Sequence, residues 1–281
     1  MYNKLCYLDR LKYNYYLYKY NKNGKYKNIK KLITILSKVD NSENQNKTEY
    51  DIFIPIGRGC HTAMMLNNID LRKKSFPFDW ISSSIRSVDV MSLEIDYIIN
   101  DFNNFLNYED LDFKDENSDK KYYFVYDKRS SLFFGHDFLK SKPIKEAYEE
   151  VYQKYKRSIN RLYDYINKLD NICFVYMQNT WDQFYFSEIM IEDKIVELNL
   201  YKLRKRFPNK KIDIIIFQHA NKRLLEYSFD KINESSYIYF SNHKYTKDSY
   251  KLGTILSIEK IFNDRYKLSD KFLGLEEKVA L

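Results

Sequence analysis

The stretch DIFIPIGRGCHTAMMLNN (51–68) decides the fold class. Its first part, DIFIPIG (51–57), is a continuous apolar run that ends in glycine, which is typical of a short buried strand. The part that follows, CHTAMMLNN (60–68), has the pattern of a helix that begins at Cys60. A strand that turns through two glycines into a helix is typical of α/β layer folds.

The same alternation continues along the chain. Apolar runs predict further strands at 121–127, 171–177, 212–218 and 236–241. Helical patterns lie between or beside them at 84–99, 145–169, 184–206, 219–230 and 252–264. Apolar strands that alternate with helices indicate an α/β fold with a mostly parallel sheet flanked by helices, and Cys60 at a strand-to-helix turn.

The segment 145–169 carries the clearest helical signal. Its apolar residues recur at alternating steps of four and three, which places them on one face of a long amphipathic helix. They are Tyr148, Tyr152, Tyr155, Ile159, Leu162, Ile166 and Leu169. The acidic, Asn-rich segment 107–120 has no such pattern, and we expect a surface loop there.

Charge divides the chain of 281 residues, whose net charge is +8. Residues 1–50 hold 11 Lys and Arg against 4 Asp and Glu, and the rest of the chain is nearly neutral. With the polar linker 41–47, this predicts a basic Tyr/Lys-rich N-terminal arm and linker (1–47) and an α/β catalytic-like domain (48–281). A nucleic-acid-binding body is disfavoured, although the arm could touch nucleic acid, an anionic surface or an acidic partner, or be a solvated helix.

The cysteine count and the apolar runs bear on the compartment. Three cysteines, Cys6, Cys60 and Cys173, cannot form a disulfide framework. The N-terminal sequence has no secretory apolar region, and no run reaches the roughly 18 apolar residues of a membrane span. We therefore expect a cytoplasmic protein, in the host cytoplasm if it is viral, and the Lys, Asn, Tyr and Ile content suggests an AT-rich genome.

The turn IPIGRGC (54–60) is the first candidate site. A thiol at a helix N-terminus lies near the positive end of the helix dipole, so we expect a lowered pKa for Cys60. First-turn N–H groups could hold an oxyanion, and Gly57, Arg58 and Gly59 would shape the turn or contact substrate. A dinucleotide loop does not fit, because Thr62 stands at the last glycine position. The alternative for Cys60 is a small apolar residue packed under the sheet.

Histidines supply the candidate base. His136, in GHDF (135–138), lies in a non-helical segment and could take the proton of Cys60. Asp137 is expected to bond to the loop, since neighbouring side chains of extended backbone point in opposite directions. The whole His–Asp pair could instead only stabilise the loop. His219 and His243 also follow predicted strands and are alternative bases.

Two further polar groups could join this site. Asp79, in the aromatic stretch FPFDW (76–80), needs a His or Arg partner in apolar surroundings. It could orient His136 or cap a helix that begins near Ser82. Gln178 follows the strand 171–177 and could supply an amide to the substrate.

The order of these motifs resembles that of a known family. G-x-x-C, then PFDW, then HDF before a long helix with Arg157 and Arg161 is similar to a family of uncharacterised bacterial and large-DNA-virus proteins described as papain-like cysteine peptidases. The resemblance covers roughly residues 51–218. It implies Cys60 as the nucleophile and His136 as the base, with Asp79 and Asp137 as further residues of the pattern.

The leading interpretation is a papain-like cysteine peptidase, or a related thiol hydrolase or acyltransferase, that acts on an amide or ester bond through Cys60 and His136. Its partner would be a protein or a small acyl or amide substrate. We expect no cofactor and no metal, because no C-x₂-C or H-x₃-H spacing occurs around these residues. One alternative is a non-catalytic site in which Arg58 and Arg129 grip a phosphate or sugar nucleotide. Another is an interaction protein that works through its basic arm.

Overall fold

The computed structural model describes residues 48–57, 59–83, 87–114, 121–177, 193–219, 229–233, 236–241 and 266–272. Nearly all of them belong to one compact unit, Glu49–Asn242 with Leu268–Leu281. The predicted arm, 1–47, lies outside the described residues, so the predicted division of the chain into an arm and a body stays a prediction.

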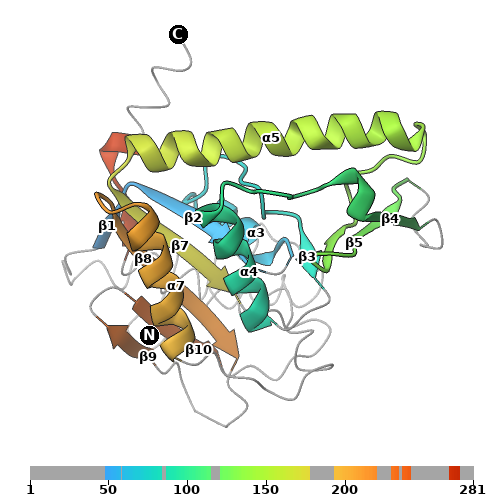
Figure 1. Ribbon diagram of the computed structural model, residues 1–281. Helices are drawn as coiled ribbons and strands as arrows, with labels where there is room; N and C mark the ends of the chain where they lie inside the picture. Colours follow the sequence, from blue (N-terminus) through green and yellow to red (C-terminus); the bar gives the residue numbers. More distant parts are fainter. Residues whose placement is uncertain are drawn as a thin grey trace, which may run out of the picture. The chain divides into compact units, whose positions relative to one another are not determined.

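A parallel sheet forms the centre of this unit (Figure 1). Its strand order is β2-β7-β8-β10-β9, and the first four strands run parallel, as predicted. The fifth strand, β9, is antiparallel to β10. The strands are β2 (Ile52–Ile56), β7 (Asn171–Met177), β8 (Lys211–His219), β9 (Phe229–Asn233) and β10 (Ser236–Ser241).

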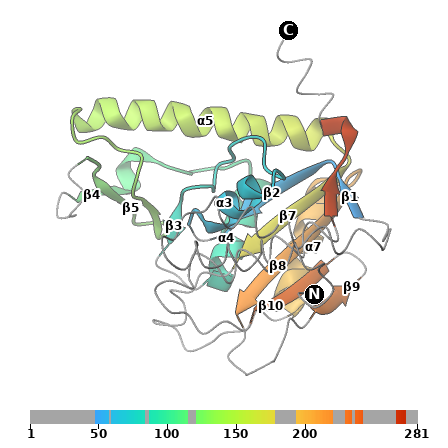
Figure 2. The same ribbon diagram turned by 180° about the vertical axis from the view of Figure 1, so that it is seen from behind.

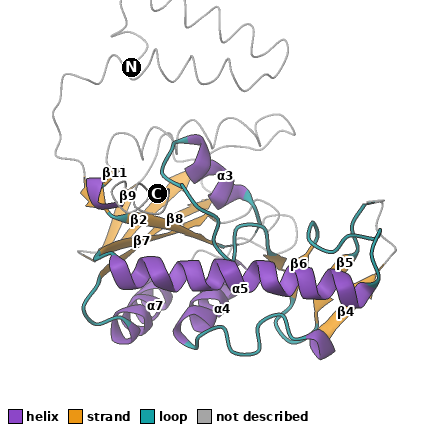
Figure 3. Ribbon diagram, turned by 90° about the horizontal axis from the view of Figure 1, so that it is seen from above, coloured by secondary structure: helices purple, strands orange, loops and turns teal. Residues whose placement is uncertain are grey.

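Helices cover both faces of this sheet. Every residue of β2 is buried, and so is every residue of β7 after Asn171, which requires cover on both sides. Helix α3 (His61–Asn68) lies on one face, whereas α4 (Ser87–Ile99) and α7 (Asp193–Arg206) lie together on the other (Figures 2 and 3). The fold is therefore the predicted layered α/β fold.

The long helix α5 (Ile144–Lys168) runs along the β2 side of the sheet (Figures 1 and 3). Its buried residues recur every three or four positions, which confirms the predicted helical period. The predicted face is only partly right, because Tyr152 is exposed and Tyr148 and Ile159 are half-buried. Each fully buried apolar side chain contributes about 1.5–3 kcal/mol, so this face fixes the helix to the core. The buried residues are Ala147, Val151, Tyr155, Ser158, Leu162 and Ile166.

A second, antiparallel sheet packs near the first half of α5, where the Tyr155 ring centroid lies 5.6 Å from that of Phe134. Its strand order is β3-β6-β5-β4. The strands are β3 (Ser82–Ser83), β4 (Leu111–Lys114), β5 (Phe124–Asp127) and β6 (Leu132–Phe134), and the short η2 (Tyr108–Asp110) precedes β4. The remaining short strands are β1 (Thr48–Tyr50) and β11 (Tyr266–Leu268).

Several sequence expectations differ from this structure. The predicted loop 107–120 contains η2 and β4. In β4, Leu111 is buried and Lys114 is exposed, but a strand of four residues is too short for this pattern to stand out in the sequence. The predicted helix 219–230 meets β8 at its start and β9 at its end, and 220–228 lie outside the described residues. The predicted helix 252–264 lies outside them entirely.

No helix within the described ranges has the length and apolar character needed to cross a membrane.

Candidate functional site

The turn between β2 and α3 depends on its two glycines. Gly57 has a φ of 111° and Gly59 a φ of 82°, values that strain residues with a side chain. A Cβ on Gly57 would also lie 2.9 Å from two ring carbons of Tyr176 on β7. Glycine is therefore required at position 57 by its backbone angle and by the ring beside it. Arg58 lies outside the described residues.

Both glycine N–H groups already have acceptors. Gly57 donates to a carboxylate oxygen of Glu94 on α4, and Gly59 donates to the carbonyl oxygen of Ile81 at 2.7 Å. Neither N–H is left for an oxyanion, so the two glycines shape the turn. The backbone donors that a substrate oxyanion could use belong to the first turn of α3, where N–H groups have no intrahelical acceptor.

Cys60 is the residue that precedes α3, at its N-cap position. It is half-buried, and its carbonyl oxygen accepts the Met64 N–H at 2.8 Å, the first hydrogen bond of the helix. Burial raises the pKa of the Cys60 thiol from 9.0, and the hydrogen bond from its own N–H lowers it less. The pKa of Cys60 is therefore raised, whereas the sequence predicted that it would be lowered. Because Cys60 is only half-buried, it is not a core residue packed under the sheet, the alternative considered for it.

Glu94 is a further residue of this site, which was not predicted from the sequence. It lies on α4, is fully buried, and its Oε2 accepts the Gly57 N–H. Its neighbours on the same helix face, Val90, Met91 and Ile98, are buried apolar residues. In the sequence, Glu94 stands three or four positions from these apolar residues, on the same helix face, and this spacing could have identified it as a buried carboxylate. Burial raises the pKa of Glu94 well above 4.5, against the lowering effect of the Gly57 N–H.

Asp79 of the FPFDW stretch pairs with Arg72. Its Oδ2 is bound by the Arg72 guanidinium and accepts the Phe76 N–H at 2.9 Å. Burial raises the pKa of Asp79, while Arg72 and the Phe76 N–H lower it. The proposed roles of Asp79, orienting His136 or capping a helix near Ser82, therefore need correction: its partner is Arg72, and β3 begins at Ser82.

His136 lies in the segment that follows β6, and it is exposed. β6 is antiparallel to β3, with Phe133 opposite Ser82, so the chain after Phe133 runs alongside Ile81, the acceptor of the Gly59 N–H. This pairing places the start of the His136 segment beside Ile81, and among the described residues no hydrogen bond or ion pair joins His136 to Cys60. Among the described residues, no hydrogen bond joins His136 to another side chain, and its ring packs edge-on near that of Tyr122, with 6.1 Å between ring centroids.

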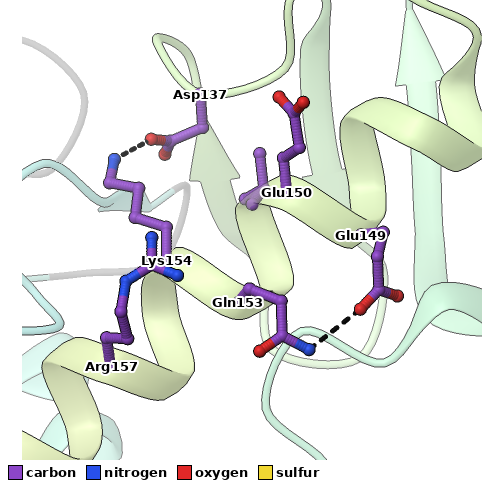
Figure 4. Close-up of a pocket in the computed structure, with 7 residues that line it drawn as sticks. Asp137, Glu149, Glu150, Gln153, Lys154 and Arg157 are labelled. Carbon is purple, nitrogen blue, oxygen red and sulfur yellow. Dashed lines mark hydrogen bonds and ion pairs between the residues drawn. The ribbon is translucent and has the colours of Figure 1, made fainter.

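Asp137 binds α5. Its carboxylate pairs with Lys154 (Figure 4). It also accepts the Tyr155 hydroxyl at 2.8 Å. Only 2% of its side chain is exposed, and it fixes the loop to the helix. The sequence predicted instead a hydrogen bond within the loop. Beside it, a hollow of about 500 Å³ lies on the outer face of α5; residues around it include Glu149, Glu150, Gln153, Lys154 and Arg157.

Other candidates lie at the same edge of the sheet or outside the described residues. Because β2, β7 and β8 are parallel, His219 at the end of β8 shares the carboxyl edge with Gly57. Gln178 and His243 lie outside the described residues. Cys173 is buried in β7, where burial raises its thiol pKa well above 9.0. Within the described ranges, no three His, Cys, Asp or Glu side chains gather to hold a metal.

Comparison with known protein families agrees with the sequence resemblance. Residues 51–222, more than half of the chain, match the model of the family described as "Putative papain-like cysteine peptidase (DUF1796)". No curated protein and no solved structure matches the chain. The matched range includes the Cys60 turn, Arg72 and Asp79, Glu94 and the His136 segment. The protein therefore belongs to this family.

Proposed function

We propose that the protein is a thiol hydrolase or acyltransferase, and within that class a cysteine peptidase, with Cys60 as its nucleophile. The observation that carries this proposal is the position of Cys60, half-buried at the N-cap of α3 directly after a two-glycine turn. This position lies beyond the carboxyl end of a parallel strand, where α/β proteins bind their ligands. It combines a half-buried thiol with the N–H groups of a helix N-terminus, which have no intrahelical acceptor.

The reaction would begin with transfer of the Cys60 proton to a histidine. The sulfur then forms a bond to the carbonyl carbon of an amide or ester, and the carbonyl π electrons move onto oxygen. N–H groups of the first turn of α3 stabilise that oxyanion. The oxyanion collapses, the bond to the amine or alcohol breaks, and the leaving group takes the proton back from the histidine. Water or another acceptor then removes the acyl group from Cys60.

The environment of Cys60 favours a resting thiol rather than a preformed thiolate. Burial raises the pKa of Cys60, and among the described side chains no cation contacts the thiol to oppose this. A thiol of this kind needs a general base at the moment of attack, as serine does in serine hydrolases. The proposal therefore assigns the base an active role in the first step.

We assign the role of base to His136, with His219 and His243 as alternatives. The support for His136 is the pairing of β6 with β3, whose neighbour Ile81 binds the Cys60 turn through Gly59. The exposed His136 ring, with its loop fixed by Asp137, is accessible to a substrate or a proton. The substrate would be a protein or a small acyl or amide compound, in the cytoplasm.

The reaction of the protein with p-nitrophenyl acetate tests the proposal. This ester should acetylate Cys60 and release p-nitrophenolate in a burst that matches one acetyl group per chain. Cys60→Ser should abolish the burst, while Cys173→Ser, a buried thiol on β7, should leave it unchanged. If Cys60→Ser retains the burst, the proposal fails; binding of inorganic phosphate without a burst would favour the non-catalytic alternative.

A further inference from the structure

Glu94 is the most deeply buried acidic side chain at the Cys60 turn, and the proposed reaction does not use it. It belongs to α4, on the face of the sheet opposite α3, and none of its surface is exposed. One carboxylate oxygen accepts the Gly57 N–H. The other oxygen, Oε1, is buried and has no hydrogen-bond partner among the described residues.

These contacts are too few for a carboxylate ion. A buried charge is stable only when a cation or several hydrogen bonds compensate for the lost water. The Glu94 carboxylate accepts one backbone N–H, and among the described residues it forms no ion pair. Burial without a cation therefore favours the protonated carboxyl group, and the raised pKa of Glu94 agrees with this geometry.

We propose that Glu94, as an uncharged carboxyl group, is the positioning residue that holds the Gly57–Cys60 turn in its reactive geometry. The inference rests on the proposed function of Cys60 and adds a residue to it. Glu94 does not touch the substrate; it acts through the backbone of Gly57.

The backbone of residues 57–59 connects the Glu94 hydrogen bond to Cys60. Gly57 lies between the Tyr176 ring on one side and the Glu94 carboxyl group that accepts its N–H. Gly59 is held by Ile81 at 2.7 Å. The two hydrogen bonds fix both ends of the turn, and this orients the Cys60 sulfur relative to the first N–H groups of α3. A shift of that turn would misalign the sulfur and the oxyanion donors.

The test compares two reactions of Cys60 in the full-length chain. Acetylation by p-nitrophenyl acetate passes through an oxyanion, whereas alkylation by iodoacetamide does not, so their rate ratio reports the alignment of the turn. Glu94→Gln keeps an uncharged acceptor of the same size, and Glu94→Leu removes the acceptor. Asn199→Leu is the matched control, because Asn199 on α7 is buried, bonds to Ser92 on α4 at 3.0 Å and also has one unpaired oxygen.

We expect Glu94→Gln to keep the rate ratio within about twofold of wild type, and Glu94→Leu to lower it by about tenfold or more. Asn199→Leu should lower the melting temperature and leave the ratio unchanged. A ratio in Glu94→Gln that falls as far as in Glu94→Leu would overturn the proposal, because it would show that the charge is needed. An unchanged ratio in Glu94→Leu would overturn it as well.

Two further outcomes distinguish a failure of the positioning role of Glu94 from a failure of the proposed function of Cys60. Wild-type Cys60 that is acetylated no faster than in the urea-unfolded chain would overturn both. Normal wild-type acetylation with an unaffected Glu94→Leu variant would overturn the positioning role alone. If Glu94→Leu does not fold, Glu94→Met, whose side chain is unbranched, replaces it. A strongly lowered ratio of acetylation to alkylation rate in Glu94→Gln still contradicts the proposal.

Discussion

The ring of Tyr176 on β7 occupies the space beside Gly57 that a side chain at this position would need. Two of its ring carbons lie 2.9 Å from the point where a Cβ of Gly57 would stand. Tyr176 is opposite Ile56 in the parallel pairing of β2 and β7, so the sheet itself brings the ring to the end of β2. The geometry of the Cys60 turn is thus coupled to the packing of the central strands.

Gly57→Ala should destabilise the protein and distort the Cys60 turn. The φ of 111° costs a residue with a Cβ about 1–3 kcal/mol, and the contact with Tyr176 adds to it. Gly135→Ala is the control, because a Cβ there would meet no atom within 4 Å. Denaturant unfolding measures both variants. Equal stability of the two would contradict the structure of the turn.

The pair of Arg72 and Asp79 should contribute to stability rather than to chemistry. Arg72→Leu leaves a wholly buried carboxyl group without its cation, which costs about 3–5 kcal/mol for a buried pair. Lys73→Ala, which breaks a contact with the 84% exposed side chain of Asp70, should cost less than about 1 kcal/mol.

Asp79→Asn separates the two roles considered for Asp79. In the Arg72→Leu background it should recover part of the lost stability, because the buried charge is then removed. Chemical unfolding of the two single variants and the double variant gives the coupling energy. If Asp79→Asn instead abolished acetylation of Cys60 and left stability unchanged, Asp79 would act through His136 after all.

The fold was predictable where apolar patterns are long. The ranges of β7 and β10 equal the predicted 171–177 and 236–241, and α5 begins one residue before the predicted 145 and ends one before 169. The antiparallel sheet was predictable only in part: β5 lies within the predicted strand 121–127, but the other strands have two to four residues, too few for a pattern to stand out. That β5 pairs with these strands rather than with the parallel sheet depends on the tertiary fold.

The site was predictable where local sequence determines geometry. The pair of glycines before Cys60 indicated the strand-to-helix turn, and the structure has it. The kind of partner that Asp79 has was predictable, since a buried carboxylate needs a His or Arg, and the structure supplies Arg72. The partner of Gly57 was not predictable, since Glu94 is 37 residues away and tertiary packing alone brings them together. The direction of the Cys60 pKa was wrong for the same reason, because burial depends on the surrounding fold.

Glu94 should make stability depend on pH. Its folded pKa lies above 4.5, so the native state binds more protons than the unfolded chain in the range between the two values. Stability from this group is present below about pH 4.5 and falls as pH rises towards the folded pKa. Glu94→Gln does not titrate, so its melting temperature relative to wild type should increase from pH 5 to pH 8. A constant difference across that range would show that Glu94 has an ordinary pKa.

The acetylation of Cys60 at pH 7, with and without His136, tests the central claim most directly. Mass spectrometry after reaction with p-nitrophenyl acetate locates the acetyl group on Cys6, Cys60 or Cys173. We predict that Cys60 carries it, and that His136→Ala slows its acetylation by about 10²-fold or more, the usual effect of losing a general base. His219→Ala and His243→Ala, measured in parallel, show whether another histidine serves as the base instead. Acetylation of Cys60 no faster than that of Cys6, or unaffected by all three histidine substitutions, would contradict a Cys–His site.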